Sequence, residues 1–307
     1  MSTDAALPST PAATSATDRR PTLPGRKRRH IRPGRIVLHL SLMAIMAVWA
    51  VPAIGLFINS FRPSSAVSSS GWWTAFAPPF EFTFSNYTEV LNQQGLGRAF
   101  LNSVLITVPS TIIVIAVAAF AAYAFAWMDF PGKNVIFVVV VGLLVVPLQV
   151  TLVPLLRLFA DLGIAGTFLA VWLAHTGFGL PFAVYLLRNY MGGLPRAVFE
   201  AAAIDGANPA TTFFRLALPM SAPVLAAMAI FQFLWVWNDL LVALVFIGAQ
   251  RSSLPLTVTV GNLVNSLGGE WHLLTAAAFI MMALPVAVFL ALQRYFVRGI
   301  TGGAVKG

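Results

Sequence analysis

Six long stretches of the chain carry almost no charged side chains, and short polar segments separate them. Asp239, in the fifth stretch, is the only Asp, Glu, Lys or Arg residue inside any of them, and the shortest stretches have 23 residues. About 20 apolar residues are enough for an α-helix to cross the hydrocarbon core of a bilayer. We therefore predict six transmembrane helices. The stretches are residues 36–61, 99–128, 134–156, 162–187, 216–250 and 271–293.

The overall composition supports an integral membrane protein of the all-α class. The chain is 58% hydrophobic and 9% charged, whereas soluble domains average about 25% charged residues. It contains no cysteine, which excludes disulfides, cysteine nucleophiles and cysteine metal ligands. The net charge of +9 would also suit a nucleic-acid ligand. In a membrane protein we attribute it to topology instead, and we expect a lipid bilayer and no nucleic acid as partner.

The basic residues predict an orientation for the chain. Eight of the nineteen lie in residues 1–35, a Pro-, Ser-, Thr- and Arg-rich segment that we expect to be disordered. If this tail is cytoplasmic, only four basic residues fall on the outer side, so the positive-inside rule places both termini in the cytoplasm. The four are Arg62, Arg98, Arg157 and Arg251.

This topology gives the expected organisation of the chain. The expected segments are a basic cytoplasmic tail (1–35), a first transmembrane helix (36–61), an extracytoplasmic segment (62–97), a core with helices two to six (98–294) and a cytoplasmic C-terminal tail (295–307). We expect the extracytoplasmic segment to be irregular, with Trp72 and Trp73 suited to the lipid interface.

The polar segment 200–219, EAAAIDGANPATTFFRLALP, interrupts the apolar pattern between the fourth and fifth helices. Residues 201–203 are alanines, which favour helix and let another surface approach closely. Gly206 is expected to end this helix, and Asn208 followed by proline to cap and start the next. We predict two short helices that run into a membrane span at Pro219 and form a cytoplasmic docking surface. Its charged residues are Glu200, Asp205 and Arg215.

Two ionisable residues, His175 and Asp239, lie deep in the apolar stretches, where an ionisable group is costly unless it faces protein or water. Asp239 follows Trp237 and Asn238, and this combination could stack on a sugar and hydrogen-bond its hydroxyl groups. The alternative is that Asn238 and Asp239 tie helices together or cap a broken helix. For His175 the alternative is a hydrogen-bonded packing residue.

Prolines and glycines within the stretches predict bends or breaks in the transmembrane helices. Such breaks line protein-buried cavities or merely help helices to pack. The residues are Pro147, Pro154, Pro181, Pro285, Gly142, Gly177 and Gly179.

No catalytic or nucleotide-binding motif is present in the sequence. Gly132 and Lys133 form a Gly-Lys pair, but Trp127 replaces the first glycine of a phosphate-binding loop and Asn134 replaces its Ser or Thr. HExxH and GxSxG patterns are absent, and the four histidines are scattered along the chain. We therefore predict no metal site, no ATP site and no enzymatic activity for this chain.

The segment 200–219 resembles the EAA loop of permease subunits from binding-protein-dependent ABC importers. The similarity lies in Glu200-Ala201-Ala202, Asp205-Gly206-Ala207 and the ending Leu216, Leu218 and Pro219. The remaining motifs are similar to the carbohydrate-uptake branch, in particular to its MalG-like subunits. They are Asn86-Tyr87, Asn102-Ser103, Pro147-Leu148-Gln149 with Pro154, Leu180-Pro181-Phe182, Trp237-Asn238-Asp239 and the C-terminal residues 293–299 and 303–307.

This resemblance implies a type I ABC importer permease fold in the bacterial inner membrane, with the EAA loop acting as a coupling helix. The implied partners are a second homologous permease, a cytoplasmic ATPase dimer that binds ATP and Mg²⁺, and an extracytoplasmic sugar-binding protein. This chain itself would bind no cofactor. The implied coupling residues are Glu200, Ala201, Ala202, Asp205, Gly206, Ala207, Leu218 and Pro219. The expected substrate-pathway residues are Trp237, Asn238 and Asp239.

Three other functions are compatible with parts of the pattern. An ABC permease for a non-sugar solute, such as a polyamine, phosphate or peptide, would share the loop. A proton-coupled secondary transporter needs a relay of several deep acidic residues, and the apolar stretches contain only one, Asp239. An intramembrane enzyme needs a convergent nucleophile and base or a metal triad, which the sequence does not suggest.

Overall fold

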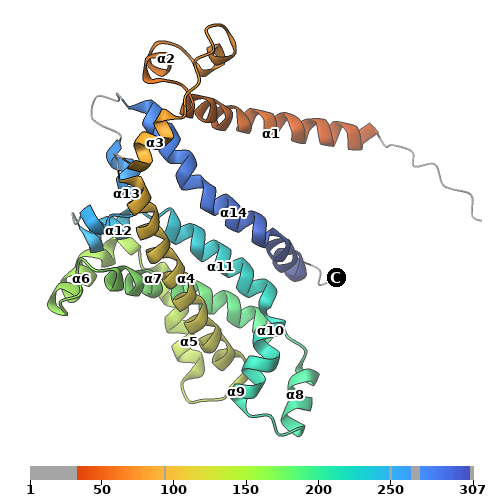
Figure 1. Cartoon of the computed structure of the whole chain (residues 1–307). Helices are drawn as coiled ribbons and strands as arrows, with labels where there is room; N and C mark the ends of the chain where they lie inside the picture. Colours follow the sequence, from red (N-terminus) through yellow and green to blue (C-terminus); the bar gives the residue numbers. More distant parts are fainter. Residues whose placement is uncertain (1–32, 93–94, 249–250, 264–269, 305–307) are drawn as a thin grey trace, which may run out of the picture. The chain divides into compact units, whose positions relative to one another are not determined.

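A computed structural model describes residues 33–92, 95–248, 251–263 and 270–304 of the chain (Figure 1). All regular elements in these ranges are helices, which confirms the all-α class. Four of the described helices are long and apolar enough to cross a membrane. They are α1 (Pro33–Ser60), α4 (Leu96–Trp127), α7 (Phe168–Gly192) and α14 (Trp271–Ala304).

Two of the predicted spans are bent pairs of helices. Residues Lys133–Val145, which comprise α5 (Lys133–Gly142) and η2 (Leu143–Val145), meet α6 (Leu148–Asp161) at 105°. The break falls at Pro147, which is extended (φ −64°, ψ 129°) and has no amide hydrogen for a continuing helix. Counting each bent pair as one span, the described residues contain up to six candidate spans, which is the number that the sequence predicts.

The second bent pair corrects the expected start of the fifth span. Residues Pro209–Met220 meet α11 (Ala222–Trp237) at 73°, so the chain turns after Met220 instead of running straight into the membrane from Pro219. The apolar stretch 216–250 is also not one helix, because α11 ends at Trp237 and α12 begins at Leu241.

The prolines further along the chain behave differently from Pro147. Pro154, Pro181 and Pro285 lie inside the continuous helices α6, α7 and α14. The remaining elements are α2 (Ser64–Ser69), η1 (Trp72–Phe76), α3 (Ser85–Asn92), α8 (Arg196–Ile204), α9 (Pro209–Thr212), η3 (Phe213–Ala217), α10 (Leu218–Met220), α12 (Leu241–Ile247), η4 (Arg251–Ser253) and α13 (Leu256–Leu263).

The chain divides into two compact units, Met1–Ala50 and Val51–Gly307. In the first unit, residues 34–49 of α1 are all exposed and mostly aliphatic, as expected for a helix that meets lipid. The predicted tail, residues 1–35, lies outside the described residues up to position 32.

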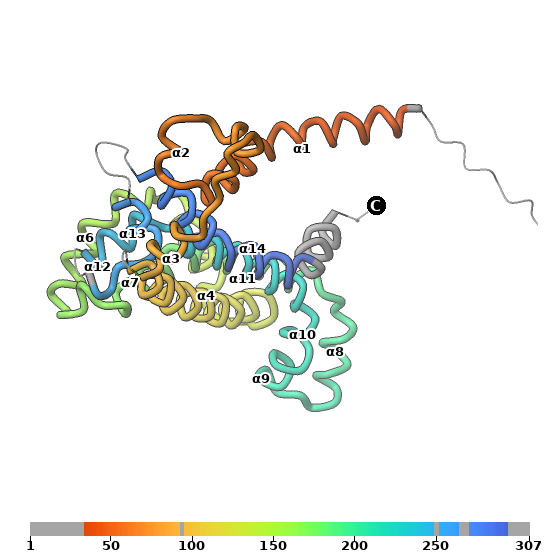
Figure 2. Tube along the Cα trace, turned by 45° about the horizontal axis from the view of Figure 1, so that its top comes forward, coloured from red at the N-terminus to blue at the C-terminus, as the bar shows by residue number. Residues whose placement is uncertain are grey.

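In the second unit, α4 connects the main layers of helices. It packs most extensively along α7 and also contacts α11, which in turn packs on α14 (Figures 1 and 2). Small residues at the α4–α7 interface, including Ala118, Ala122 and Ala183, let the two helices approach closely. Helix α8 lies beyond the end of α4 in both views.

Two of the motifs found in the sequence fix loops to helices. The side-chain amide of Asn86 donates to the backbone oxygens of Ser60 and Arg62, both at 2.9 Å. In α4, Asn102 donates to the backbone oxygens of Ser252 and Leu254, both at 3.0 Å. Both asparagines are buried and hold chain turns in place, so their role in this fold is structural.

Candidate functional site

Helix α8, the first helix of the predicted docking segment, packs on the rest of the protein through Phe199, its buried residue. Phe199 is 8% exposed and stacks on Trp127, the last residue of α4, with ring centroids 3.7 Å apart and planes at 12°. The Trp127 indole Nε1 donates to the backbone oxygen of Met191 in α7 at 3.0 Å. This arrangement connects α8 to the ends of α4 and α7.

The remainder of α8 presents a free surface. Glu200, Ala201, Ala203 and Ile204 are exposed, and Ile204 is 86% exposed. Within the described part of the chain, no basic side chain lies within ion-pair distance of Glu200. A short helix with small residues, one carboxylate and a large exposed apolar side chain is typical of a docking surface.

The turn after α8 confirms the glycine prediction. Gly206 has φ +77°, its amide donates to Ala203 O at 3.1 Å, and the Ala207 amide donates to Ala202 O at 2.9 Å. This is a Schellman motif, in which glycine occupies the left-handed position at low cost.

The second helix of the segment begins as the sequence predicts. The Asn208 side-chain oxygen accepts from the Thr211 amide at 2.8 Å, and proline follows at the first helical position. The chain then forms a π-helix, η3, a geometry that is frequent at functional sites.

The second half of the segment is anchored in the core. Phe213 is buried and stacks on Phe120 of α4, with ring centroids 4.6 Å apart, and it also contacts Tyr123. Leu218 is half-buried, whereas Pro219 is exposed. The docking segment therefore contacts α4 at two places, through Phe199 in α8 and through Phe213 and Phe214 in η3. The sequence reasoning named none of these phenylalanines, although all are large apolar residues in or beside a polar segment.

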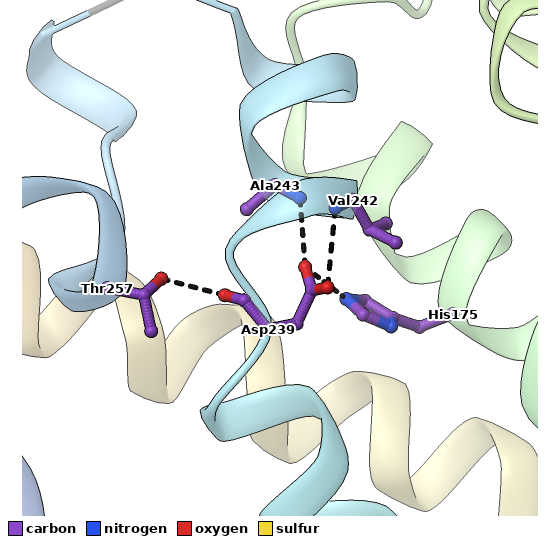
Figure 3. Close-up of polar contacts among 5 residues, drawn as sticks. All are labelled: His175, Asp239, Val242, Ala243 and Thr257. Carbon is purple, nitrogen blue, oxygen red and sulfur yellow. Dashed lines mark hydrogen bonds and ion pairs between the residues drawn. The ribbon is translucent and has the colours of Figure 1, made fainter. Parts of the chain in front are cut away.

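Asp239 forms the centre of a polar cluster within the helices (Figure 3). Its carboxylate oxygens accept from the amides of Val242 at 3.3 Å and Ala243 at 3.0 Å, in the first turn of α12. Its backbone oxygen accepts from Thr257 Oγ1 at 2.7 Å. The fully buried His175 of α7 places Nε2 3.7 Å from Asp239 Oδ2. Asp239 thus caps a broken helix, which is the structural alternative that the sequence left open.

Trp237 and Asn238 also have internal partners. Trp237 is buried between Phe100 and Phe233, and its Nε1 donates to Met281 O in α14 at 3.0 Å. Asn238 is exposed and donates to Leu234 O at 2.8 Å. The geometry favours a packing role for Trp237, and the assignment of Trp237, Asn238 and Asp239 to a substrate pathway stays a prediction.

A polar residue that the sequence reasoning missed lies five residues before Trp237 in α11. Gln232 is 1% exposed, and its Nε2 has no hydrogen-bond partner among the described residues. It contributes to the wall of a 210 Å³ hollow between α7 and α11. The available signal was that Gln232 is the only amide side chain in the apolar sequence of α11.

Comparison with known proteins places the chain in a family. Residues 114–302 match the family model described as "Binding-protein-dependent transport system inner membrane component". This region begins within α4 and includes the docking segment, the Asp239 cluster and most of α14.

Individual relatives agree with this match. The chain is 56% identical over 275 residues to the osmoprotective compounds uptake permease protein GgtD of Synechocystis sp., covering 89% of this chain and 92% of that protein. It is 58% identical over 241 residues to the alpha-glucoside transport system permease protein AglG of Rhizobium meliloti, covering 77% and 63%.

A solved bacterial alginate ABC transporter, in complex with an alginate pentasaccharide-bound periplasmic protein, has a chain of the same fold. The TM-score is 0.63 at 12% identity, and the match covers 84% of this chain and 93% of that chain. The chain described here therefore belongs to the family of inner membrane components of binding-protein-dependent transport systems.

Proposed function

We propose that this chain is a permease subunit of an ATP-driven, binding-protein-dependent importer of sugars. It forms half of a translocation pathway with a second related permease, above a cytoplasmic ATPase dimer and below an extracytoplasmic sugar-binding protein. The observation that carries this proposal is the exposure of α8. Its Phe199 stacks on Trp127, while Glu200 on the same helix is exposed. Family membership and the absence of a phosphate-binding loop in the sequence support it.

In this proposal the energy reaches the chain through a contact between α8 and the ATPase. The ATPase dimer binds ATP and Mg²⁺, and its closure moves α8. The stacks of Phe199 on Trp127 and Phe213 on Phe120 pass the movement to α4, which packs against α7 and α11. The coupling residues are Glu200, Ala201, Ala202, Asp205, Gly206, Ala207, Leu218 and Pro219.

The substrate class proposed is α-glucosides and related neutral sugars. AglG, named for alpha-glucoside transport, is 58% identical to this chain. A second candidate is a non-sugar osmoprotective solute, since GgtD is named for osmoprotective compounds and is similar over almost its whole length. Proton coupling is disfavoured because the Asp239 carboxylate is already bonded to the amides of α12.

Reconstituted transport tests the proposal. The chain, the second permease, the ATPase and the binding protein would be assembled in proteoliposomes and supplied with radiolabelled maltose, sucrose or trehalose. We expect vanadate-sensitive uptake that requires both the ATPase and the binding protein. Uptake that a proton gradient drives without the ATPase would contradict the proposal. Uptake of osmoprotective solutes in place of all three sugars would assign the second candidate.

Reversing the charge of Glu200 in α8 should uncouple ATP hydrolysis from transport. In Glu200→Lys we expect the protein to insert and assemble, while uptake falls about tenfold or more, because the loss of a charged contact at an interface costs about 2–5 kcal/mol. Uptake and binding-protein-stimulated ATPase activity would be measured together. Val198→Thr, a near-isosteric change at an exposed position of the same helix, should behave as the parent. Normal coupling in Glu200→Lys would refute the contact.

Two substitutions at Asp239 separate its capping role from a pathway role. Asp239→Ala removes both capping bonds and should lower the free energy of unfolding by about 1 kcal/mol, while Asp239→Asn keeps a capping oxygen and most of the stability. Thermal unfolding of the detergent-purified protein and sugar uptake would be compared. If Asp239→Asn lost uptake at unchanged stability, the carboxylate would be a pathway group after all.

A further inference from the structure

A hollow lies between α7 and α11, away from both ends of α7. We call it the α7–α11 hollow, and its volume is 210 Å³. It opens at the surface of the chain, since Phe182 and Phe231 at its rim are 38% and 55% exposed. Its lining residues are Phe178, Gly179, Phe182, Phe231, Gln232 and Trp235.

The single amide side chain in this lining is Gln232. The residue is almost fully buried, and its Nε2 atom has no hydrogen-bond partner in the described ranges. Buried polar groups in proteins are nearly always paired, so an unpaired amide in a cavity wall identifies a group able to bind a ligand. The amide can both donate and accept, which suits a hydroxyl group.

Gly179 of α7 makes room for this amide. A Cβ atom at position 179 would lie 2.8 Å from both Nε2 and Oε1 of Gln232, closer than real contacts allow. The side chain of Gln232 therefore rests directly against the backbone of α7. Any larger residue at position 179 would displace the amide from its place in the wall.

The other walls of the α7–α11 hollow are aromatic, and one of them is held in place by the polar cluster. The ring edge of His175 meets Trp235 with centroids 5.2 Å apart and planes at 86°. His175 itself is buried and contacts Asp239 on its other side. An aromatic face beside one hydrogen-bonding amide is a combination that suits a sugar ring, which has apolar C–H faces and peripheral hydroxyls.

We propose that the α7–α11 hollow is a subsite for a sugar ring of the transported substrate, with Gln232 bonding a hydroxyl and Trp235 contacting the ring face. This inference rests on the proposed function. A neighbouring hollow of 390 Å³ shares Phe178 and Trp235 with it, and its volume falls in the range of about 300–1,000 Å³ typical of ligand sites. His175 acts as a positioning residue for that tryptophan.

Two substitutions test the subsite in the fully assembled transporter. Gln232→Leu removes the hydrogen bond at similar size, and Gly179→Ala displaces the amide. Gly192→Ala is the control, because it makes the same chemical change at the end of the same helix, where a Cβ meets open space. The ratio of radiolabelled maltose, sucrose or trehalose imported to ATP hydrolysed would be measured in proteoliposomes. We expect this ratio to fall about fivefold or more in the two test variants, as one lost hydrogen bond implies, and to be unchanged in the control.

The possible results distinguish a failure of the subsite proposal from a failure of the proposed function. Parent-like ratios in both test variants would overturn the subsite and leave the proposed function intact. A loss in Gly179→Ala alone, with Gln232→Leu normal, would show that the hollow is only a packing feature and would also overturn it. If the unmodified transporter imported none of the three sugars in an ATPase-dependent way, the proposed function would fail, and the sugar subsite with it.

A cysteine reporter distinguishes a sugar from lipid or from a side chain of the second permease. The chain has no cysteine, so Phe231→Cys introduces a single thiol at the rim of the hollow. We expect a small water-soluble thiosulfonate reagent to label it, and the transported α-glucoside to slow labelling about fivefold or more. No labelling by the hydrophilic reagent would indicate lipid or a covering protein surface, and labelling insensitive to the sugar would mean that no sugar binds there. Either result would overturn the proposal.

Discussion

Replacement of Gly206 by proline should abolish sugar uptake while leaving the protein inserted in the membrane. Gly206 has φ +77°, and the proline ring holds φ near −65°. Proline also removes the amide that donates to Ala203 O and disfavours the conformation of Asp205 before it, which has φ −72° and ψ 1°. The Schellman turn that sets the direction of α8 relative to α9 would be lost. Binding-protein-dependent uptake and the amount of protein in the membrane would be measured together.

A graded series at this position isolates the backbone effect. The space around Gly206 is open, since a Cβ there would meet nothing within 4 Å, so φ alone decides the outcome. Gly206→Asn should retain most of the uptake because asparagine tolerates the left-handed conformation, and Gly206→Ala should lose part of it, at a cost of about 1–2 kcal/mol. If the Pro variant retained as much uptake as the Asn variant, the geometry of the turn would not matter for coupling.

The local signals in the docking segment could be interpreted from the sequence because each depends on a few neighbouring residues. Gly206 ends α8, and Asn208 caps α9, as predicted. Both depend on backbone conformations that few residue types favour, so the residue type alone carries the information. The six apolar stretches were equally informative, since spanning a bilayer is a matter of length and composition.

Which of the predicted breaks inside the apolar stretches form could not be decided in the same way. Pro147 and Pro154 lie in one stretch, yet the chain turns at Pro147 and continues as helix through Pro154. Each proline removes one helical donor, but the helix continues wherever neighbouring groups satisfy the freed carbonyl, and that depends on packing. For the same reason the sequence left two roles open for Asp239, a substrate contact or the cap of a broken helix, and its bonds to the amides of α12 appear only in the fold.

The contacts that attach the site to the bundle were missed because they join distant parts of the chain. Phe199 and Phe213 pack on Trp127 and Phe120 of α4, and Gln232 rests on Gly179 of α7. A single sequence contains no signal for which aromatic residue meets which. For Trp237, the neighbours in sequence suggest a sugar site, whereas the partners in the fold are aromatic rings and a backbone carbonyl, and its place in a substrate pathway stays a prediction.

Loss of the Phe199 ring should disconnect α8 from the membrane helices. Removing a buried phenylalanine side chain costs about 3–5 kcal/mol, and a helix of nine residues is too short to be stable without packing. In Phe199→Ala we therefore expect uptake to fall about tenfold or more, which corresponds to at least about 1.4 kcal/mol. ATP hydrolysis by the assembled complex would no longer respond to the loaded binding protein. Both rates would be measured on the same proteoliposomes.

A comparison of coupling among variants at Phe199 and Trp127 tests whether the stack of these two rings transmits the movement of α8. Phe199→Tyr keeps the ring on Trp127 and should restore coupling, Phe199→Leu keeps apolar volume without stacking and should be intermediate, and Val198→Ala should match the parent. Trp127→Phe keeps the stack but loses the bond to Met191 O, at a cost of about 1 kcal/mol, and should be mild. If Phe199→Ala coupled normally, the movement of α8 would have to reach α4 through the second half of the segment, where Phe213 and Phe214 contact Phe120.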